Sequence, residues 1–146
     1  MKTMVNGMNK QQVLIVDDEE LNRVILMEMF KEVPEKYTLI EAENGLNAVR
    51  QIESNDNIVL ILLDVVMPVM DGFKVLEYMK EHDLLDEIPV ILITGETIKD
   101  SEDKAYSFGV ADVIHKPFYP HIVKRRSRNI IELYQNKRNM ELRLKE

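Results

Sequence analysis

Short apolar runs that alternate with helical patterns constrain the fold of this chain more than any other feature. The runs are rich in β-branched residues, and they lie at residues 13–16, 37–42, 58–63, 90–93 and 113–115. Between them, apolar residues recur at helical spacing, as Leu21, Val24 and Ile25 do after the first run. Runs that are short and apolar throughout are typical of strands buried on both faces of a parallel sheet. The pattern therefore predicts five consecutive strand–helix units.

Five such units predict an α/β domain in which helices cover both faces of a parallel sheet. The crossover from one strand through a helix to the next parallel strand is right-handed, so the chain forms a doubly wound sandwich. The length of 146 residues fits one such domain with one extra element. We predict a flexible lead-in at residues 1–11, the domain at residues 12–135, and a helical extension or linker toward an output domain at residues 136–146.

Composition and charge exclude several classes of protein. The chain has no cysteine, which excludes disulfides, thiolate metal sites and cysteine nucleophiles. It has no signal peptide and no run of about 20 apolar residues, so we expect a cytoplasmic protein without membrane contact. Residues 119–146 hold eight Lys and Arg against three Glu, which leaves residues 1–118 with 11 basic and 23 acidic side chains. The excess of acidic side chains in residues 1–118 argues against direct nucleic-acid binding.

Polar residues follow four of the five predicted strands, at the point where each strand ends. They are Asp17 and Asp18 after the first strand, Asp64 after the third, Thr94 after the fourth and Lys116 after the fifth. The carboxyl ends of parallel strands lie on one edge of the sheet, where doubly wound folds bind their ligands. Each residue alone would more often cap a helix or form a turn. Their occurrence together at successive strand ends favours a single site.

The predicted site has the chemistry of phosphoryl transfer. Three neighbouring carboxylates repel one another unless a cation compensates for their charge. Oxygen ligands select Mg²⁺ or Ca²⁺, and an open site that keeps waters beside a phosphate suits Mg²⁺. Lys116 and Thr94 offer a positive charge and a hydroxyl to phosphate oxygens. A carboxylate held beside the metal can attack phosphorus and form an aspartyl phosphate.

Four motifs of the chain resemble those of the receiver domains of two-component response regulators. They are VDDE at residues 16–19, LLDVVMPVMDG at 62–72, ITG at 93–95 and KPF at 116–118. The resemblance covers roughly residues 12–135. It implies a flavodoxin-like (βα)5 fold with strand order 2-1-3-4-5, here followed by an extended C-terminal helix. It also implies a phosphoacceptor signalling domain rather than an enzyme, with a sensor histidine kinase or phosphotransfer protein as partner.

The resemblance assigns each site residue a role in binding Mg²⁺ or phosphate. The metal ligands would be Asp17 (largely through a bound water), Asp18, Asp64 and the backbone carbonyl of Val66. Asp64 would accept the phosphoryl group, Thr94 would donate a hydrogen bond to it, and Lys116 would pair with it. The peptide bond before Pro117 would be cis, and Gly72 would permit a positive φ in the loop after the acceptor.

Two positions depart from the pattern of the family. Receiver domains usually carry an aromatic residue three positions before the lysine, which swings inward when the threonine moves toward phosphate, but this chain has Val113. We interpret Val113 as a core strand residue, so movement would pass through the loop after Thr94 and the fourth helix. Val66 is apolar and cannot orient an attacking water, whereas Glu96 could. We therefore predict moderate to slow hydrolysis of the aspartyl phosphate.

The last predicted helix is longer than this fold requires. Its residues at alternating steps of three and four form a heptad seam of Val123, Arg126, Ile130, Leu133, Lys137, Met140 and Leu144. The seam favours a homodimer formed by the last sheet edge and this helix; the alternative is an amphipathic helix that packs on the sheet and then frays. Residues 128–134 are similar to helices that lead into GGDEF or HD-GYP output domains. The chain is either part of a longer regulator or signals by dimerisation and docking.

Other kinds of site fit parts of the same pattern less well. A phosphohydrolase of the haloacid-dehalogenase type also uses an aspartate with Mg²⁺, Thr and Lys, but it needs a second Asp where this chain has Glu19. A flavodoxin-like cofactor binder would need a phosphate-binding loop after the first strand, where residues 17–20 are all acidic. The three histidines, His82, His115 and His121, lack metal-ligand spacing, so no zinc site is expected. The phosphoacceptor hypothesis is the strongest.

Overall fold

The computed structural model describes residues 10–67, 69–95 and 99–145, with the backbone alone at residues 99–101. Within them, five strands alternate with five helices. The strands are β1 (Gln12–Val16), β2 (Thr38–Ala42), β3 (Ile58–Asp64), β4 (Val90–Thr94) and β5 (Asp112–His115). The helices are α1 (Glu20–Lys31), α2 (Gly45–Ser54), α3 (Gly72–Glu81), α4 (Lys99–Phe108) and α5 (Pro120–Leu144). The five predicted strand–helix units are confirmed, whereas most of the predicted lead-in lies outside the described residues.

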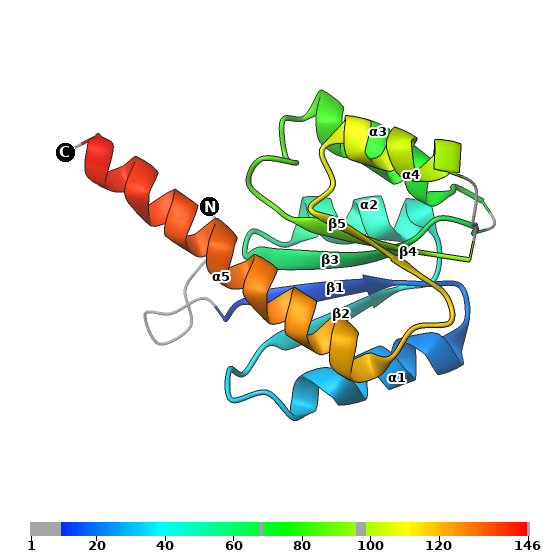
Figure 1. Ribbon diagram of the computed structural model, residues 1–146. Coiled ribbons are helices and arrows are strands. Elements are labelled where there is room, and N and C mark those ends of the chain that lie inside the picture. The colour runs from blue at the N-terminus through cyan, green and yellow to red at the C-terminus, as the bar shows by residue number, and fades with distance from the viewer. Residues whose placement is uncertain (1–9, 68, 96–98, 146) are drawn as a thin grey trace.

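The strands form one parallel sheet in the order β2-β1-β3-β4-β5. Helices α1 and α5 cover one face of this sheet, and α2, α3 and α4 cover the other (Figure 1). The doubly wound fold and the strand order implied by the resemblance are both confirmed. None of the helices in the described part of the chain is both long and apolar enough to cross a lipid bilayer.

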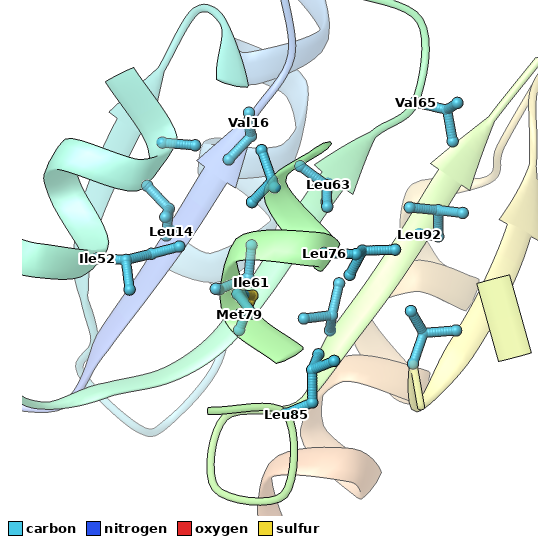
Figure 2. Close-up of a cluster of buried hydrophobic side chains, with 14 of the residues drawn as sticks. Leu14, Val16, Ile52, Ile61, Leu63, Val65, Leu76, Met79, Leu85 and Leu92 are labelled. Carbon is cyan, nitrogen blue, oxygen red and sulfur yellow. The ribbon is translucent and has the colours of Figure 1, made fainter. Parts of the chain in front are cut away.

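The central strands are apolar throughout because both of their faces are buried. In β3, Ile61 and Leu63 face the helices α2 and α3, while Leu60 and Leu62 belong to the core on the α1 and α5 side. Figure 2 shows the first of these cores, where Leu76 lies over the side chains of β3. Burial of a leucine or isoleucine contributes about 1.5–3 kcal/mol, so the two cores hold the strand ends in fixed positions.

Helix α5 divides into a part that packs on the sheet and a part that does not. Val123 and Ile131 are buried against the sheet, and Ile130 packs on the same core. Beyond them the helix runs clear of the domain (Figure 1), and Met140 and Leu144 are 63% and 85% exposed. The predicted heptad seam is therefore wrong in its first half, because a side chain that faces the core is not available to a partner helix.

The loop between β3 and α3 depends on a glycine for a reason that the sequence did not indicate. The predicted positive φ at Gly72 is wrong, and Val69 has a φ of 70° instead. A side chain at position 72 would overlap the backbone carbonyl oxygen of Asp64. The glycine thus allows α3 to begin directly against the end of β3. Gly109, by contrast, has a φ of 101° and directly follows the end of α4, where a glycine commonly terminates a helix.

The close approach at Gly72 predicts a large effect of a single methyl group. We expect Gly72→Ala to lower the free energy of unfolding by about 1–3 kcal/mol, because the backbone of β3 or α3 must move to admit the methyl. Urea unfolding followed by circular dichroism measures this change. Gly95→Ala is the matched control, since an added methyl there meets no described atom within 4 Å. Equal losses of stability in the two variants would contradict the assignment.

Candidate functional site

The polar residues predicted to converge do so at the carboxyl ends of the strands. Val16 of β1 pairs with Leu63 of β3, so the residues that follow them, Asp17 and Asp64, lie side by side. Thr94 ends the neighbouring strand β4, and its carbonyl oxygen accepts a hydrogen bond from the Lys116 amide at 2.8 Å. Asp17, Asp64 and Thr94 are only 2%, 3% and 2% exposed. The prediction that these residues share one edge of the sheet is confirmed.

Three carboxylates form a cluster with the dimensions of a cation site. One oxygen from each of Asp17, Asp18 and Asp64 lies within 4.8 Å of the other two. Asp17 and Asp64 are buried and Asp18 is exposed, so the cluster opens to solvent on one side. Hard oxygen donors around an open coordination sphere suit Mg²⁺, which keeps several of its waters. Among the described residues, no histidine joins this or another metal-binding cluster.

Lys116 provides the positive charge of the site. Its Nζ lies 3.3 Å from Oδ1 of Asp64 and 3.4 Å from Oδ2 of Asp17. Burial lowers the pKa of Lys116, but the two carboxylates outweigh burial and hold the pKa above its ordinary value. The lysine is therefore a permanent cation that bridges two strands at their ends.

One lysine does not neutralise three carboxylates. The pKa of Asp64 is raised from 3.8 to about 6, mainly by burial and next by the neighbouring charge of Asp17, while Lys116 acts in the opposite direction. Removal from water disfavours the ionised form of a carboxyl group, and a like charge nearby adds to this cost. The site therefore lacks positive charge, which a bound divalent cation would supply.

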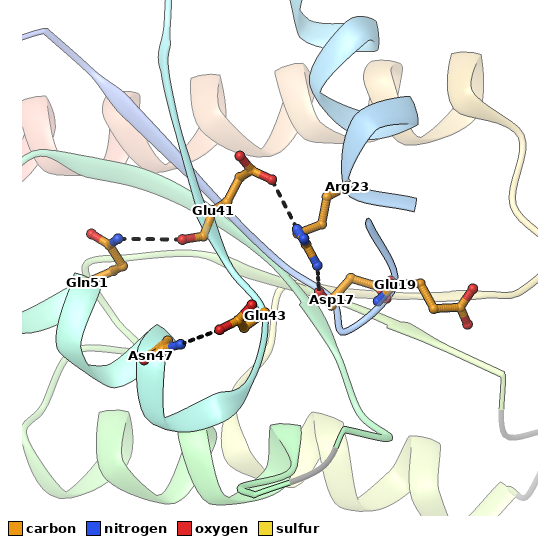
Figure 3. Close-up of polar contacts among 7 residues, drawn as sticks. All are labelled: Asp17, Glu19, Arg23, Glu41, Glu43, Asn47 and Gln51. Carbon is orange, nitrogen blue, oxygen red and sulfur yellow. Dashed lines mark hydrogen bonds and ion pairs between the residues drawn. The ribbon is translucent and has the colours of Figure 1, made fainter. Parts of the chain in front are cut away.

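Asp17 is held in place by the first turns of α1. Its Oδ1 accepts a hydrogen bond from the Glu19 amide at 2.9 Å, and its Oδ2 accepts one from the Asn22 side chain at 3.3 Å. Arg23 donates from Nη1 to the Asp17 carbonyl at 2.6 Å and from Nε to Glu41 at 3.0 Å, so it ties β1 to β2 (Figure 3).

Asn22 and Arg23 are not among the site residues predicted from the sequence. The available signal was their position, since they follow the acidic pair by one turn of a predicted helix. Side chains in a first turn lie close to the chain that enters the helix, so a polar pair at this spacing can support the residues before it. This support fixes the orientation of Asp17 toward Lys116.

The loop after Asp64 is clamped at two points. The Gly72 amide donates to the carbonyl of Val65 at 2.9 Å, and the Gly45 amide donates to the carbonyl of Met70 at 3.0 Å. The first residues of α2 and α3 thus both hold this loop. The side chain of Val66, in this loop, is 59% exposed to solvent. Metal binding by the Val66 carbonyl stays a prediction.

Other expectations for the site region have mixed outcomes. The Lys116–Pro117 peptide bond is cis, as the resemblance implied. Val113 is buried and pairs with Leu92 of β4, so its interpretation as a core strand residue is confirmed. Glu96, considered for water activation, lies outside the described residues. The predicted moderate to slow hydrolysis of the aspartyl phosphate therefore rests on Val66 alone.

The raised pKa of Asp64 predicts how stability depends on pH in the metal-free protein. The folded state binds this proton more tightly than the unfolded state, so its contribution to stability is present below pH 3.8 and is lost as the pH rises to about 6. Asparagine has a similar shape and no charge. We expect Asp64→Asn to raise the free energy of unfolding at neutral pH by up to about 3 kcal/mol, at about 1.4 kcal/mol per pKa unit.

Urea unfolding at several pH values, in the presence of a chelator, tests this prediction. The gain from Asp64→Asn should shrink toward zero as the pH falls to that of an unperturbed carboxyl group. Asp56→Asn, an exposed position at the opposite end of β3, serves as the control and should leave the pH dependence unchanged. A gain from Asp64→Asn that does not vary with pH would refute the electrostatic explanation.

Comparison with known proteins shows what this chain is similar to. A family model described as "Response regulator receiver domain" matches residues 13–127. The chain is 33% identical, over 86% of its length, to the "Transcriptional regulatory protein SrrA" of Staphylococcus aureus, of which it covers 49%. It is 29% identical, over 77% of its length, to the "Two-component response regulator ORR5" of Oryza sativa, of which it covers 83%.

Solved structures show the same fold. The signal receiver domain of a putative Luxo repressor protein from Vibrio parahaemolyticus matches with a TM-score of 0.82 and 24% identity, and the match covers 91% of this chain and 98% of that one. A probable two-component system response regulator/GGDEF domain protein matches with a TM-score of 0.77 and 23% identity, over 86% of this chain and 50% of that one. The chain thus spans about half the length of SrrA and of the GGDEF protein.

Proposed function

The chain belongs to the response regulator receiver family, and on this premise we propose that it is a phosphoacceptor whose Asp64 receives a phosphoryl group from a sensor histidine kinase or a phosphotransfer protein. The observation that carries the proposal is the position of Asp64. It is buried at the end of β3, 3.3 Å from the lysine Nζ and beside two further carboxylates. We place the reaction in the cytoplasm, where ATP-dependent kinases act.

The proposed reaction moves one phosphoryl group between two side chains. A carboxylate oxygen of Asp64 forms a bond to phosphorus while the bond between phosphorus and the donor's imidazole nitrogen breaks, and the imidazole then takes a proton from solvent. Lys116 needs only a small movement from Asp64 to contact an oxygen of the new phosphate. Thr94, at the end of the adjacent strand, would donate its hydroxyl hydrogen to another.

Mg²⁺ is the cofactor that this site would hold. Asp18 and Asp64 would bind it directly, with the carbonyl of Val66, and Asp17 would act largely through a water. The ion would supply the positive charge that the cluster lacks and would stabilise charge on the phosphoryl oxygens. The raised pKa of Asp64 supports this assignment, because a nearby cation would restore the ionised form that attacks phosphorus.

Family membership favours a signalling domain over a phosphohydrolase of the haloacid-dehalogenase type. The acceptor Asp64 ends the third strand, whereas that type places its nucleophile after the first. The buried acids of the site also pair with Lys116, which directly follows the last strand, in the arrangement that the receiver motifs implied. We propose turnover limited to self-phosphorylation from small donors and slow loss of the phosphate.

Intact mass spectrometry tests the phosphoacceptor directly. Incubation with Mg²⁺ and acetyl phosphate should add the mass of one phosphoryl group, and hydroxylamine should remove it, since it cleaves acyl phosphates. Asp64→Asn should abolish the adduct, whereas Asp71→Asn, a nearby acid outside the cluster, should retain it. Chelation of Mg²⁺ should slow formation of the adduct strongly. An adduct that persists in Asp64→Asn would sink the proposal.

Apolar side chains around the site support a protein as the phosphodonor. Leu21 and Val24 on α1, Val66 and Val69 in the loop after β3, and Tyr119 before α5 are all exposed. A cavity of about 480 Å³ between α1 and α5 continues this rim and is lined in part by Val24 and Pro120. A small phosphodonor needs no such surface, whereas a helical partner that presents a phosphohistidine can bury it.

The free part of α5 is proposed as a dimerisation element and a linker toward an output domain. Leu133, Met140 and Leu144 are exposed and follow steps of seven and four, which places them on one face of the helix. The likeness to half of a regulator that carries a GGDEF domain supports a position before such a domain. Dimerisation through this face would bring the free parts of α5 from two chains together, and with them the beginnings of any output domains that follow.

Sedimentation equilibrium tests the role of this helix face. We expect Met140→Glu to weaken self-association of the full chain about tenfold, because a charge replaces a buried methionine worth about 1.5 kcal/mol or more. Asn139→Glu adds the same charge on a different face and should have little effect. A full chain that remains monomeric both with and without phosphorylation would remove the dimer proposal, while leaving the phosphoacceptor intact.

A further inference from the structure

The two carboxylate oxygens of Asp17 are held by donors of different kinds. Oδ1 accepts a hydrogen bond from the Glu19 amide at 2.9 Å, within the turn that leads into α1. Oδ2 accepts from the Asn22 side chain at 3.3 Å and from Nζ of Lys116 at 3.4 Å. Because Asp17 is only 2% exposed, bulk water cannot readily replace a lost donor. Oδ2 therefore depends on one neutral amide and one cation.

The two donors on Oδ2 differ in what else they bind and in how freely they move. Lys116 also lies 3.3 Å from Oδ1 of Asp64, so one ammonium group serves two acids. It comes from the segment after β5 and carries its charge on a long, flexible side chain. Asn22 lies in the first turn of α1, and its short side chain reaches Asp17 from within the same segment. Asn22 is thus the local donor, and Lys116 is the shared and movable one.

A phosphoryl group on Asp64 would change the balance between these two donors. Phosphoryl oxygens carry more negative charge than a carboxylate and attract an ammonium group more strongly. Lys116 would turn toward them, and its contact with Asp17 would lengthen or break. A buried charged oxygen that loses its donor is unfavourable, more so than a neutral one. Of the two donors on Oδ2, Asn22 is the one that would stay.

A neutral amide suits this position because it donates a hydrogen bond without adding a charge. A lysine or arginine there would compete with Mg²⁺ for the acids, and an aspartate would add to their repulsion. The next residue, Arg23, is charged, but it donates to the carbonyl of Asp17 and to Glu41 of β2 (Figure 3). Arg23 thus fixes the backbone of Asp17, while Asn22 fixes its side chain.

We propose that Asn22 is a positioning residue that keeps the Asp17 carboxylate oriented toward the cation when Lys116 leaves it for the phosphoryl group on Asp64. This inference rests on the proposed phosphoacceptor function and on the proposed Mg²⁺ site. Both donors hold Oδ2 in the unphosphorylated protein, so the loss of one is tolerated. In the phosphorylated protein Asn22 holds Oδ2 without Lys116, and its loss then loosens Asp17 beside the bound ion.

Affinity for a phosphoryl mimic, compared with affinity for Mg²⁺ alone, tests this role. We expect Asn22→Ala to weaken binding of beryllofluoride at saturating Mg²⁺ about tenfold, and to weaken binding of Mg²⁺ alone by about twofold at most. The fluorine NMR signal of bound beryllofluoride measures the first affinity. A titration of the full chain with Mg²⁺, followed by its amide NMR signals, measures the second. A residue that only stabilised the fold would not separate the two affinities.

A matched control and a second variant guard this comparison. Asn47, on α2, also donates from its side chain to a carboxylate, that of Glu43 at 3.2 Å (Figure 3). Asn47→Ala should leave both affinities unchanged. Alanine favours a helix more than asparagine does, so Asn22→Ala should fold. Asn22→Leu, which is similar in size but has no donor, should give the same result as Asn22→Ala.

Removal of Lys116 reproduces its departure without a phosphoryl group. In Lys116→Met, Oδ2 of Asp17 loses its cation and keeps Asn22. We expect Asn22→Ala to weaken Mg²⁺ binding about tenfold in this background, against about twofold at most in the unmodified chain. The double-mutant cycle on Mg²⁺ affinity, followed by the same amide signals, measures this difference.

The outcomes distinguish this inference from the function on which it rests. If the phosphoryl adduct forms but Asn22→Ala weakens beryllofluoride binding no more than Mg²⁺ binding, the inference is wrong and the phosphoacceptor stands. Equal effects of Asn22→Ala with and without Lys116 would overturn it as well. If no adduct forms on the unmodified chain, the phosphoacceptor proposal itself fails.

Discussion

The burial of Asp64 beside other carboxylates is the interaction on which the rest of the site depends. A carboxylate at the end of a central strand loses its hydration, and Asp17 places a second negative charge next to it. Lys116, which follows the last strand, compensates at 3.3 Å and 3.4 Å from the two acids. The pKa of about 6 at Asp64 shows that this compensation is incomplete. A site with too little positive charge is suited to bind a cation and then to accept a phosphoryl group.

The elements around the cluster keep these charges together against their repulsion. Arg23 ties the backbone of Asp17 to β2, and Gly72 brings α3 against the carbonyl of Asp64 without a side chain between them. Lys116 belongs to the segment after β5, the edge strand that α4 contacts through Glu102, whose carboxylate lies 3.5 Å from Nε2 of His115.

Helix α5 shows the limit of reasoning from periodicity. Its apolar residues continue at regular spacing from Val123 to Leu144, but the helix passes from the core of the domain into open surroundings along the way. A stripe that faces a sheet and a stripe that faces a second helix need the same residue types at nearly the same spacing. The sequence therefore predicted the helix and its apolar face correctly, but it left open whether that face meets the sheet or a second helix, and the first half of the face meets the sheet.

The sequence by itself determined the five strand–helix units and the residues at the strand ends, because each of these is a local property of spacing and of where an apolar run stops. The strand order came from the family resemblance, since periodicity does not encode which strands are neighbours. Only the tertiary structure decided that Gly72 is required by the carbonyl of Asp64 and that Arg23 supports Asp17. Each of these contacts joins different elements of the fold, and such contacts depend on distances that the pattern of a single segment does not contain.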